Sequence, residues 1–220
     1  MIIAFCLPGR SQSMEFTKSF AQTMYYMGKN GIKARVFQEA GGDIYHIRND
    51  LVSRGLPIPW DMMPIFGGEP YDWIMWIDSD MGQFDFSHIQ KLIDADKDII
   101  TGVAPLGPTG RSAIGQYGYD DFGQPSVQFY NVLETDKQLD PNVPVEVEYC
   151  GYAFLLVRKG VFEAMEYPWF RYTPHEHAYK QSLLGEDLGW CVRAKEAGFK
   201  IWMLPGVKVS HNKEQCWYIG

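Results

Sequence analysis

The stretch Trp73-Ile74-Met75-Trp76-Ile77-Asp78-Ser79-Asp80 decides the fold. Its first five residues are apolar with no polar alternation, which indicates a strand buried on both faces, as in a parallel sheet covered by helices. In such sheets, ligands bind just beyond the carboxyl ends of the strands. Asp78 and Asp80 lie at that end and share one side if the chain stays extended, so they could hold a divalent cation. The same residues could equally form a turn or cap the next helix.

The apolar pattern on both sides of this stretch alternates between strands and helices. We expect strands at residues 2–7, 34–37 and 98–103, and helices at residues 16–27, 44–52 and 87–93. Ser87 and Gln90 have the spacing of a capping box at the start of the last of these helices. This order of elements is that of a parallel α/β sheet with crossover helices.

The second half of the chain has a less regular pattern. We expect a hairpin at residues 117–131, strands at 145–149, 151–157 and 200–204, a helix starting at 159, and a last helix that contains Leu188, Cys191 and Val192 and closes at Gly198. A long loop rich in aromatic residues covers residues 167–184, and loops of that length usually have a function. His175 and His177 in this loop could bind zinc, but two ligands without obvious partners are more typical of exposed loop residues.

Composition limits the classes of function. The 220 residues are 46% hydrophobic and 15% aromatic, enough for one large domain with a substantial core. The net charge of −7 and the absence of basic runs argue against a broad nucleic-acid surface. The cysteines, Cys6, Cys150, Cys191 and Cys216, form no C-x-x-C pair, and no apolar run is long enough to span a membrane. We therefore expect a soluble, cytoplasmic protein with reduced thiols.

A second acidic motif, Gly185-Glu186-Asp187, lies where the last helix is predicted to begin. The helix dipole favours carboxylates at this position by about 0.3–1 kcal/mol, and many helices begin with acids for this reason alone. The same field stabilises the ionised carboxylate, which is the form that accepts a proton. His211 follows a β-like segment near the end of the chain, and a single histidine in such a place is usually structural.

Taken in order, these motifs resemble the GT-A-fold glycosyltransferases, and family-2-like enzymes in particular. The resemblance covers nearly the whole chain and rests on the opening strand, Arg48-Asn49, Asp78-Ser79-Asp80, residues 151–158 with Val161-Phe162, and Glu186-Asp187 through to His211. It implies an α/β GT-A fold with a mostly parallel central sheet flanked by helices and a smaller mixed acceptor-side half. We accordingly expect one domain over residues 1–220, with a nucleotide-binding half at 1–103 and an acceptor-binding half at 104–220.

The resemblance implies metal-dependent transfer of a sugar from a nucleotide diphosphate sugar, most commonly a UDP-sugar, to an acceptor hydroxyl. Asp80 and His211 would bind the metal ion, Mn²⁺ or Mg²⁺, with Asp78 facing the metal or the ribose. The cation would offset the charge that grows on the leaving diphosphate. Asp187 would be the catalytic base, with Glu186 as its substitute, and attack from the opposite face of the sugar would invert the anomeric centre.

The resemblance also implies which residues contact the two substrates. The donor would lie over the ends of the first two strands and beside the first acidic motif, against Pro8, Arg10, Glu39, Asp43, Arg48, Asp78 and Ser79. The acceptor would contact Gly151 and Tyr152, and could stack on Trp169 and Tyr172 in the aromatic loop. The sequence leaves the acceptor open among a glycan, a lipid-linked sugar, a protein and a modified nucleic-acid base.

Two features depart from the family pattern, and two alternative functions stay open. The loop at residues 38–43 lacks the Asp-x-x-Ser-x-Asp that usually follows the second strand, and the Gln-x-x-Arg-Trp signature of processive members is absent. A catalytically silent relative would bind nucleotide-sugars or glycans without turnover. A sugar-1-phosphate nucleotidylyltransferase would share the sheet, although residues 7–11 are a poor version of its basic, Gly-rich loop.

Overall fold

A seven-stranded sheet forms the centre of the computed structural model, which describes residues 1–56, 63–107, 110–131, 138–178 and 183–212. Its strand order is β2-β1-β3-β10-β5-β13-β8. The strands are β1 (Ile2–Pro8), β2 (Lys33–Glu39), β3 (Trp73–Ile77), β5 (Ile99–Val103), β8 (Val145–Val147), β10 (Phe154–Arg158) and β13 (Ile201–Lys208).

The sheet is mixed, and five of its seven strands run in one direction, in agreement with the mostly parallel sheet that the resemblance implies. β1 is parallel to β2 and β3, and β5 is parallel to β13. β10 is antiparallel to both of its neighbours, β3 and β5, so these two strands share a direction. β8 is antiparallel to β13. Because β10 and β13 come from the second half of the chain, both halves contribute to one continuous sheet.

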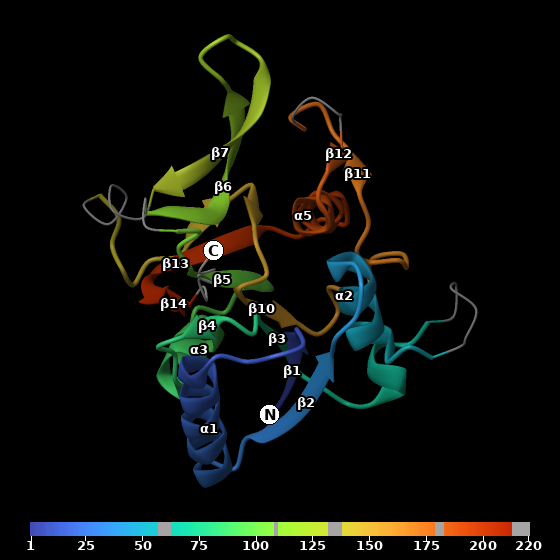
Figure 1. Ribbon diagram of the computed structural model, residues 1–220, viewed down its shortest axis with the longest axis vertical. Coiled ribbons are helices and arrows are strands. Elements are labelled where there is room, and N and C mark those ends of the chain that lie inside the picture. Colours follow the sequence, from blue (N-terminus) through green and yellow to red (C-terminus); the bar gives the residue numbers. More distant parts are fainter. Residues whose placement is uncertain (57–62, 108–109, 132–137, 179–182, 213–220) are drawn as a thin grey trace, which may run out of the picture.

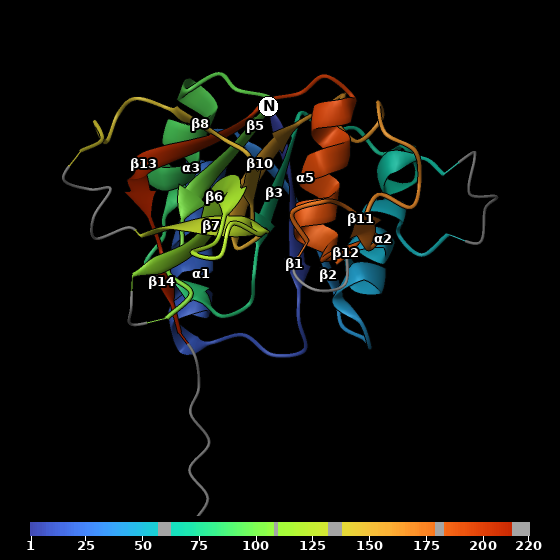
Figure 2. The same cartoon turned by 90° about the horizontal axis from the view of Figure 1, so that it is seen from above.

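Helices cover both faces of this sheet (Figures 1 and 2). α1 (Met14–Lys29) and α3 (Phe86–Asp94) pack on the face that carries Trp73, Met75 and Ile77. α2 (Ile44–Ser53) and α5 (Glu186–Glu196) pack on the opposite face with Ile74 and Trp76. All five side chains of β3 are buried. Burial on both faces is the reason that this strand has no polar alternation.

Three small sheets surround the central one. β6 (Arg111–Tyr119), β7 (Pro125–Asn131) and β9 (Tyr149–Cys150) form a three-stranded antiparallel sheet, whose β6–β7 hairpin confirms the hairpin predicted at residues 117–131. β11 (Thr173–Pro174) pairs with β12 (Leu183–Leu184), and β4 (Met81–Gly82) pairs with β14 (Ser210–His211). A short 3₁₀ helix, η2 (Ile65–Gly68), precedes β3.

Four local expectations from the sequence are wrong. The capping box of α3 is made by Asp85 and His88 rather than by Ser87. The expected strand at 145–149 divides into β8 and β9, because the chain passes from the central sheet to the small sheet near Glu148. β10 begins at Phe154 rather than at Gly151. The expected helix from Lys159 is a single turn.

Two predictions about the chain as a whole concern thiols and membranes. Cys6, Cys150 and Cys191 are free and buried, and Cys216 lies outside the described residues. None of the described helices is both long and apolar enough to cross a membrane. Cytoplasmic location stays a prediction.

Candidate functional site

The carboxyl ends of β1, β2 and β3 meet at one edge of the sheet. The residues predicted to bind the nucleotide-sugar donor lie at this edge. Pro8 is opposite Glu39 in the parallel ladder, and the Gly9 amide donates to the Glu39 carbonyl oxygen at 3.0 Å. Arg10 reaches the Gly41 carbonyl oxygen at 3.4 Å. Asp43 occupies the N-cap position of α2, but its carboxylate caps no backbone amide. The loops after the first two strands are therefore joined to each other at the edge that ends in the acidic motif.

Gly9 is also the contact between the first strand and the acidic motif. Its φ is +135°, and a Cβ atom at this position would lie 2.4 Å from Ser79 Oγ. The loop after β3 is held further by the Ser13 amide, which donates to the Ser79 carbonyl oxygen at 3.2 Å. Only a glycine allows this approach, so Gly9 fixes the acidic loop against the donor side.

Asp80 and His211 lie together although 131 residues separate them along the chain. The His211 Nε2 atom is 2.8 Å from Asp80 Oδ2. The pairing of β4 with β14 creates this contact, because His211 lies opposite Met81, the residue after Asp80. The His211 Nδ1 atom is 2.8 Å from the Pro105 carbonyl oxygen, which can only accept, so Nδ1 donates and Nε2 points to Asp80.

Arg48 joins the two acidic motifs. Its guanidinium donates to Glu186 Oε1 at 2.6 Å and lies 3.7 Å from Asp78 Oδ1. It also lies over the Tyr152 ring, 4.6 Å from the ring centre. Arg48 is only 5% exposed. The charge of Arg48 is thus already paired with two carboxylates, and its direct contact with the donor stays a prediction.

Asp78, Asp80, Glu186 and Asp187 lie close enough to affect one another's ionisation, and we call them the acid cluster. Burial raises the pKa of Asp78, the Arg48 charge opposes that rise, and the nearby Asp80 and Asp187 carboxylates add to it. Burial also raises the pKa of Glu186, against the same Arg48 charge, while Asp187 and Asp78 add to the rise. One arginine thus compensates carboxylates from both motifs, and the acids repel one another in its absence.

Asp187 is the acid of the second motif that stays free of a cation among the described residues. It lies in the first turn of α5, where its Oδ1 accepts from the Leu188 amide at 2.8 Å. Its Oδ2 faces Gly151: a Cβ atom added at Gly151 would lie 3.8 Å from that oxygen and 2.8 Å from Ala113 Cβ. Glu186, the expected substitute base, is held by Arg48 instead. Asp187 is therefore the carboxylate with an oxygen available to accept a proton.

The predicted acceptor residues divide into two groups. Gly151 lies beside Asp187, and Tyr172 is 58% exposed. Tyr152 is only 2% exposed and lies beneath Arg48, so its ring supports the acid cluster rather than a sugar. Trp169 is also 2% exposed, and its Nε1 donates to the Phe162 carbonyl oxygen at 3.1 Å. The expectation that Trp169 stacks on an acceptor is at odds with this burial.

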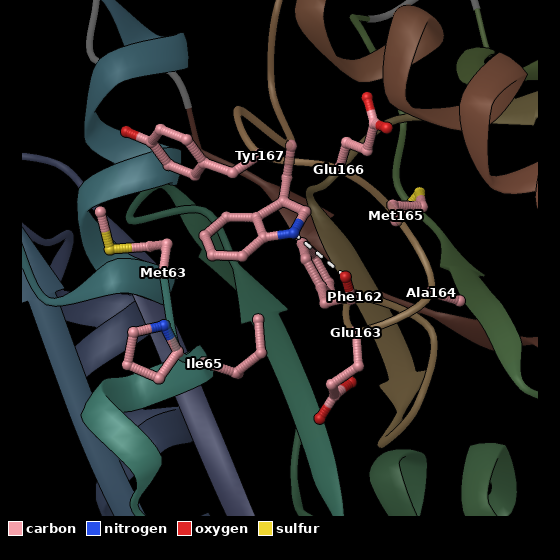
Figure 3. A pocket seen from close by; sticks show the side chains of 10 residues that line it. Met63, Ile65, Phe162, Glu163, Ala164, Met165, Glu166 and Tyr167 are labelled. Carbon is pink, nitrogen blue, oxygen red and sulfur yellow. Dashed lines mark hydrogen bonds between the residues drawn. The ribbon is translucent and has the colours of Figure 1, made fainter. Parts of the chain in front are cut away.

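Trp169 borders a separate pocket of about 590 Å³ (Figure 3). Met63, Ile65 and Tyr167 line this pocket together with the turn after β10. None of its described lining residues belongs to the acid cluster. We therefore assign this pocket no part in the site.

Several contacts that build the site could not be read from the sequence. The Pro105 carbonyl orients His211, and the Asn212 amide donates to the Asp80 carbonyl oxygen at 2.8 Å. Ala113 lies against Gly151 beside Asp187. Backbone groups and a small apolar residue leave no distinctive mark in one sequence. The positive φ of Gly9 is the exception, since the Pro8-Gly9 turn after a strand is a recognisable signal.

Replacing Gly9 by Ala should displace the acidic loop. The left-handed backbone and the overlap with Ser79 together should lower the free energy of unfolding by about 2–4 kcal/mol. Gly31→Ala is the matched control, because Gly31 has a φ of +68° but no atom within 4 Å of an added Cβ. Urea unfolding of both variants measures the difference. Equal losses would show that the Ser79 contact has no role.

Comparison with solved structures identifies the fold. The protein resembles the crystal structure of A197 from STIV, with a TM-score of 0.56, 15% identity, and coverage of 100% of this chain and 98% of that chain. It also resembles GalNAc-T7 solved with UDP, GalNAc and Mn²⁺, with a TM-score of 0.53, 9% identity, and coverage of 96% of this chain and 44% of that chain. The chain has a GT-A glycosyltransferase fold.

The remaining comparisons add little to this result. The catalytic domain of Drosophila beta1,4galactosyltransferase 7, in complex with xylobiose, matches with a TM-score of 0.48, 15% identity, and coverage of 98% of this chain and 76% of that chain. No protein-family model matches the sequence, and no curated protein matches it. At these identities, the likeness establishes the GT-A fold and not an activity.

Proposed function

We propose that this protein transfers a sugar from a nucleotide diphosphate sugar to an acceptor hydroxyl, with a divalent cation at Asp80 and His211 and with Asp187 as the base. The contact that carries the proposal is the 2.8 Å approach of Asp80 to His211. It joins the acidic motif after β3 to the imidazole of β14. Arg48 joins the same motif to α5, where Asp187 lies.

Asp80 and His211 together suit a divalent cation that also binds a substrate. Asp80 offers a carboxylate, and His211 offers an imidazole nitrogen oriented by a carbonyl on its other side, which is the usual arrangement of metal-binding histidines. Among the described residues there is no cluster of three or more potential ligands. Cations bound by one or two protein groups are normally completed by substrate phosphates and water. The imidazole favours Mn²⁺ over Mg²⁺.

The protein's own residues would then divide the chemistry. When bound, the cation would stabilise the negative charge on the departing nucleoside diphosphate. Pro8, Arg10 and Asp43 border the edge of the sheet at which we place the nucleotide of the donor. We propose that this nucleotide is uridine diphosphate. Asp187 would take the proton of the acceptor hydroxyl while the hydroxyl oxygen forms a bond to the anomeric carbon of the donor sugar. At the same time the bond between that carbon and the phosphate oxygen would break, and the nucleoside diphosphate would leave. Attack opposite the leaving group gives inversion.

The two halves of the chain follow this division. We propose that residues 1–103 bind the donor and that residues 104–220 bind the acceptor. The first range holds the loops after β1, β2 and β3, and the second holds Gly151 and Asp187. His211 crosses this division, because it belongs to the second range but would serve the donor's cation.

A panel of nucleotide-sugars with Mn²⁺ tests the function. We expect one donor to release its nucleoside diphosphate, and we expect chelation of the metal to stop that release. Asp80→Asn should weaken Mn²⁺ binding by about 100-fold, because a carboxylate ligand is lost. Asp94→Asn, an exposed acid on α3, is the control and should behave like the unchanged protein.

The outcomes separate the enzyme from its alternatives. Mn²⁺ and donor binding without turnover, by calorimetry, would indicate the catalytically silent relative. Formation of a nucleotide-sugar from a nucleoside triphosphate and a sugar-1-phosphate would indicate the nucleotidylyltransferase. Turnover that is unaffected by Asp80→Asn would overturn the assigned metal site.

A further inference from the structure

Ring side chains gather on two neighbouring segments that flank the start of α5. Tyr117 of the β6–β7 hairpin stacks on His175 with ring centres 4.5 Å apart, and it contacts His177 at 5.1 Å. Tyr119, two residues further along β6, contacts His177 at 5.9 Å. Tyr172, three residues before His175, instead contacts Tyr45 of α2, with ring centres 5.9 Å apart. We call Tyr117, Tyr119, His175 and His177 the ring surface.

The ring surface is partly open to solvent. Tyr119 is 63% exposed. Tyr117 and Tyr119 are alternate residues in the regular part of the β6–β7 ladder, so their side chains lie on the same face. The exposed ring of Tyr119 therefore continues the row begun by the half-buried ring of Tyr117. The other three rings of the surface are more enclosed and support it.

This surface is continuous with the proposed base. The segment on either side of Tyr172 packs against the first turn of α5, since a Cβ added at Gly189 would lie 2.5 Å from Thr173 Oγ1 and 2.8 Å from the Arg171 carbonyl oxygen. β12, which pairs with β11, leads directly into Glu186 and Asp187. At the other end, Ala113 of β6 lies against Gly151 beside Asp187.

The length of β6 sets the size of a ligand that could use the whole surface. Six residues separate Ala113 from Tyr119, which corresponds to about 20 Å of strand. A ring contact reaches only about 4.5–7 Å between centres. A single sugar that donates its hydroxyl to Asp187 therefore cannot also stack on Tyr119. Only an extended acceptor covers both.

The charge near these rings argues against a phosphate-bearing polymer. The charged residues of the hairpin between Tyr117 and Gln124 are Asp120 and Asp121. The ammonium of Lys195 lies 5.9 Å from the centre of the Tyr117 ring, and it is paired with the Glu148 carboxylate. Glu176 lies between the two histidines and its side chain is 79% exposed. Proteins that stack nucleic-acid bases on aromatic rings combine them with a positively charged groove. A neutral, hydroxyl-rich ligand suits this set, because carboxylates accept from hydroxyls and rings stack on the apolar faces of sugars.

We propose that the ring surface binds an oligosaccharide acceptor, whose terminal sugar presents a hydroxyl to Asp187 and whose further sugars run along β6 towards Tyr119. This inference rests on the proposed function. It adds the class of acceptor, which neither the fold nor the acid cluster defines.

The experiment uses neutral oligosaccharides of increasing length. Glucose, N-acetylglucosamine and mannose series, each from monosaccharide to hexasaccharide, serve as probes for binding by calorimetry and for transfer. In at least one series we expect affinity to rise with length. Tyr119→Ala should lower the affinity for the longest member by about two- to tenfold and leave the monosaccharide unchanged. Tyr25→Ala on α1 is the matched control, because Tyr25 is 67% exposed and outside the ring surface.

Donor hydrolysis without acceptor keeps this test separate from the proposed function. The unchanged protein should release nucleoside diphosphate from the donor, and the control Tyr25→Ala should do so at the same rate. If the protein hydrolyses the donor but its affinity for oligosaccharides does not depend on their length, the oligosaccharide proposal is overturned and the proposed transferase function is kept. The same holds if the protein transfers sugar only to a peptide or to a single-stranded DNA probe. If binding depends on length and Tyr119→Ala removes it, but the protein hydrolyses no donor, the transferase function is overturned and the binding surface is kept.

Discussion

Replacing Asp187 by Asn is expected to lower turnover with acceptor by about 10²–10⁴-fold, the usual contribution of a positioned general base. Its physical reason is that Asp187 has no cationic partner among the described residues, while Arg48 holds the neighbouring Glu186 at 2.6 Å. The amide occupies the same space but cannot take a proton. Donor binding, measured by calorimetry with Mn²⁺ present, should stay unchanged because Asp187 lies on the acceptor side.

Asp94→Asn again provides the control for this loss. Asp94 is an exposed acid on α3 whose carboxylate accepts a hydrogen bond from Gln90, outside the acid cluster. It should leave turnover unchanged. Full activity of Asp187→Asn would show that another group accepts the proton. A loss in Glu186→Gln that equals the loss in Asp187→Asn, with stability intact, would move the role to Glu186.

Replacing Arg48 by Met is expected to cause a large loss of stability. The side chain fills similar space but leaves Glu186 and Asp78 without their shared cation. Breaking a buried ion pair costs about 3–5 kcal/mol, and we expect about 3 kcal/mol because the Asp78 side chain is 31% exposed. Urea unfolding of the metal-free protein measures this. Arg48→Lys should recover part of the loss, since it restores one charge but not the two-sided contact.

The pH dependence of this variant gives an independent check. The pKa of Glu186 is already raised by burial, and Arg48 is the charge that opposes the rise. Removing Arg48 raises the folded-state pKa further above its unfolded value. The folded variant then binds protons more readily than the unfolded chain, so its stability increases as the pH falls through that pKa. The deficit of Arg48→Met should therefore shrink below neutral pH, and a constant deficit would contradict the role of Arg48.

The elements with strong periodic or unbroken apolar patterns were predictable from the sequence. β3 is an example, because burial on both faces removes polar residues from the strand itself. The antiparallel direction of β10 was not predictable, since a buried strand has the same composition in either direction. The division of residues 145–149 between two sheets was also not predictable. The alternation of apolar and polar residues continues without a break where the chain leaves the central sheet and joins the small one.

The acid cluster was predictable from a resemblance, but its internal pairing was not. Asp80 and His211 were expected to share a site, and the structure brings them within 2.8 Å. Arg48 was expected to bind the donor and Trp169 to stack on a sugar, but both side chains are buried. One sequence does not show which polar or aromatic side chains face inward. The burial of Arg48 could be predicted only together with its partners. A buried arginine needs acidic partners, and here these come from two motifs that are distant in the sequence.

The pairing of β14 with β4 has a consequence for the order of events in synthesis. Asp80 is made long before His211, at a sequence separation of 131 residues. Contacts of such long separation form late in folding, because the intervening chain must first be ordered. A nascent chain that has reached only residue 200 lacks both β13 and the imidazole. Cation affinity at the proposed Asp80–His211 pair should therefore appear only once β14 has been made and has paired with β4, and uptake of the metal would mark the closing of that ladder.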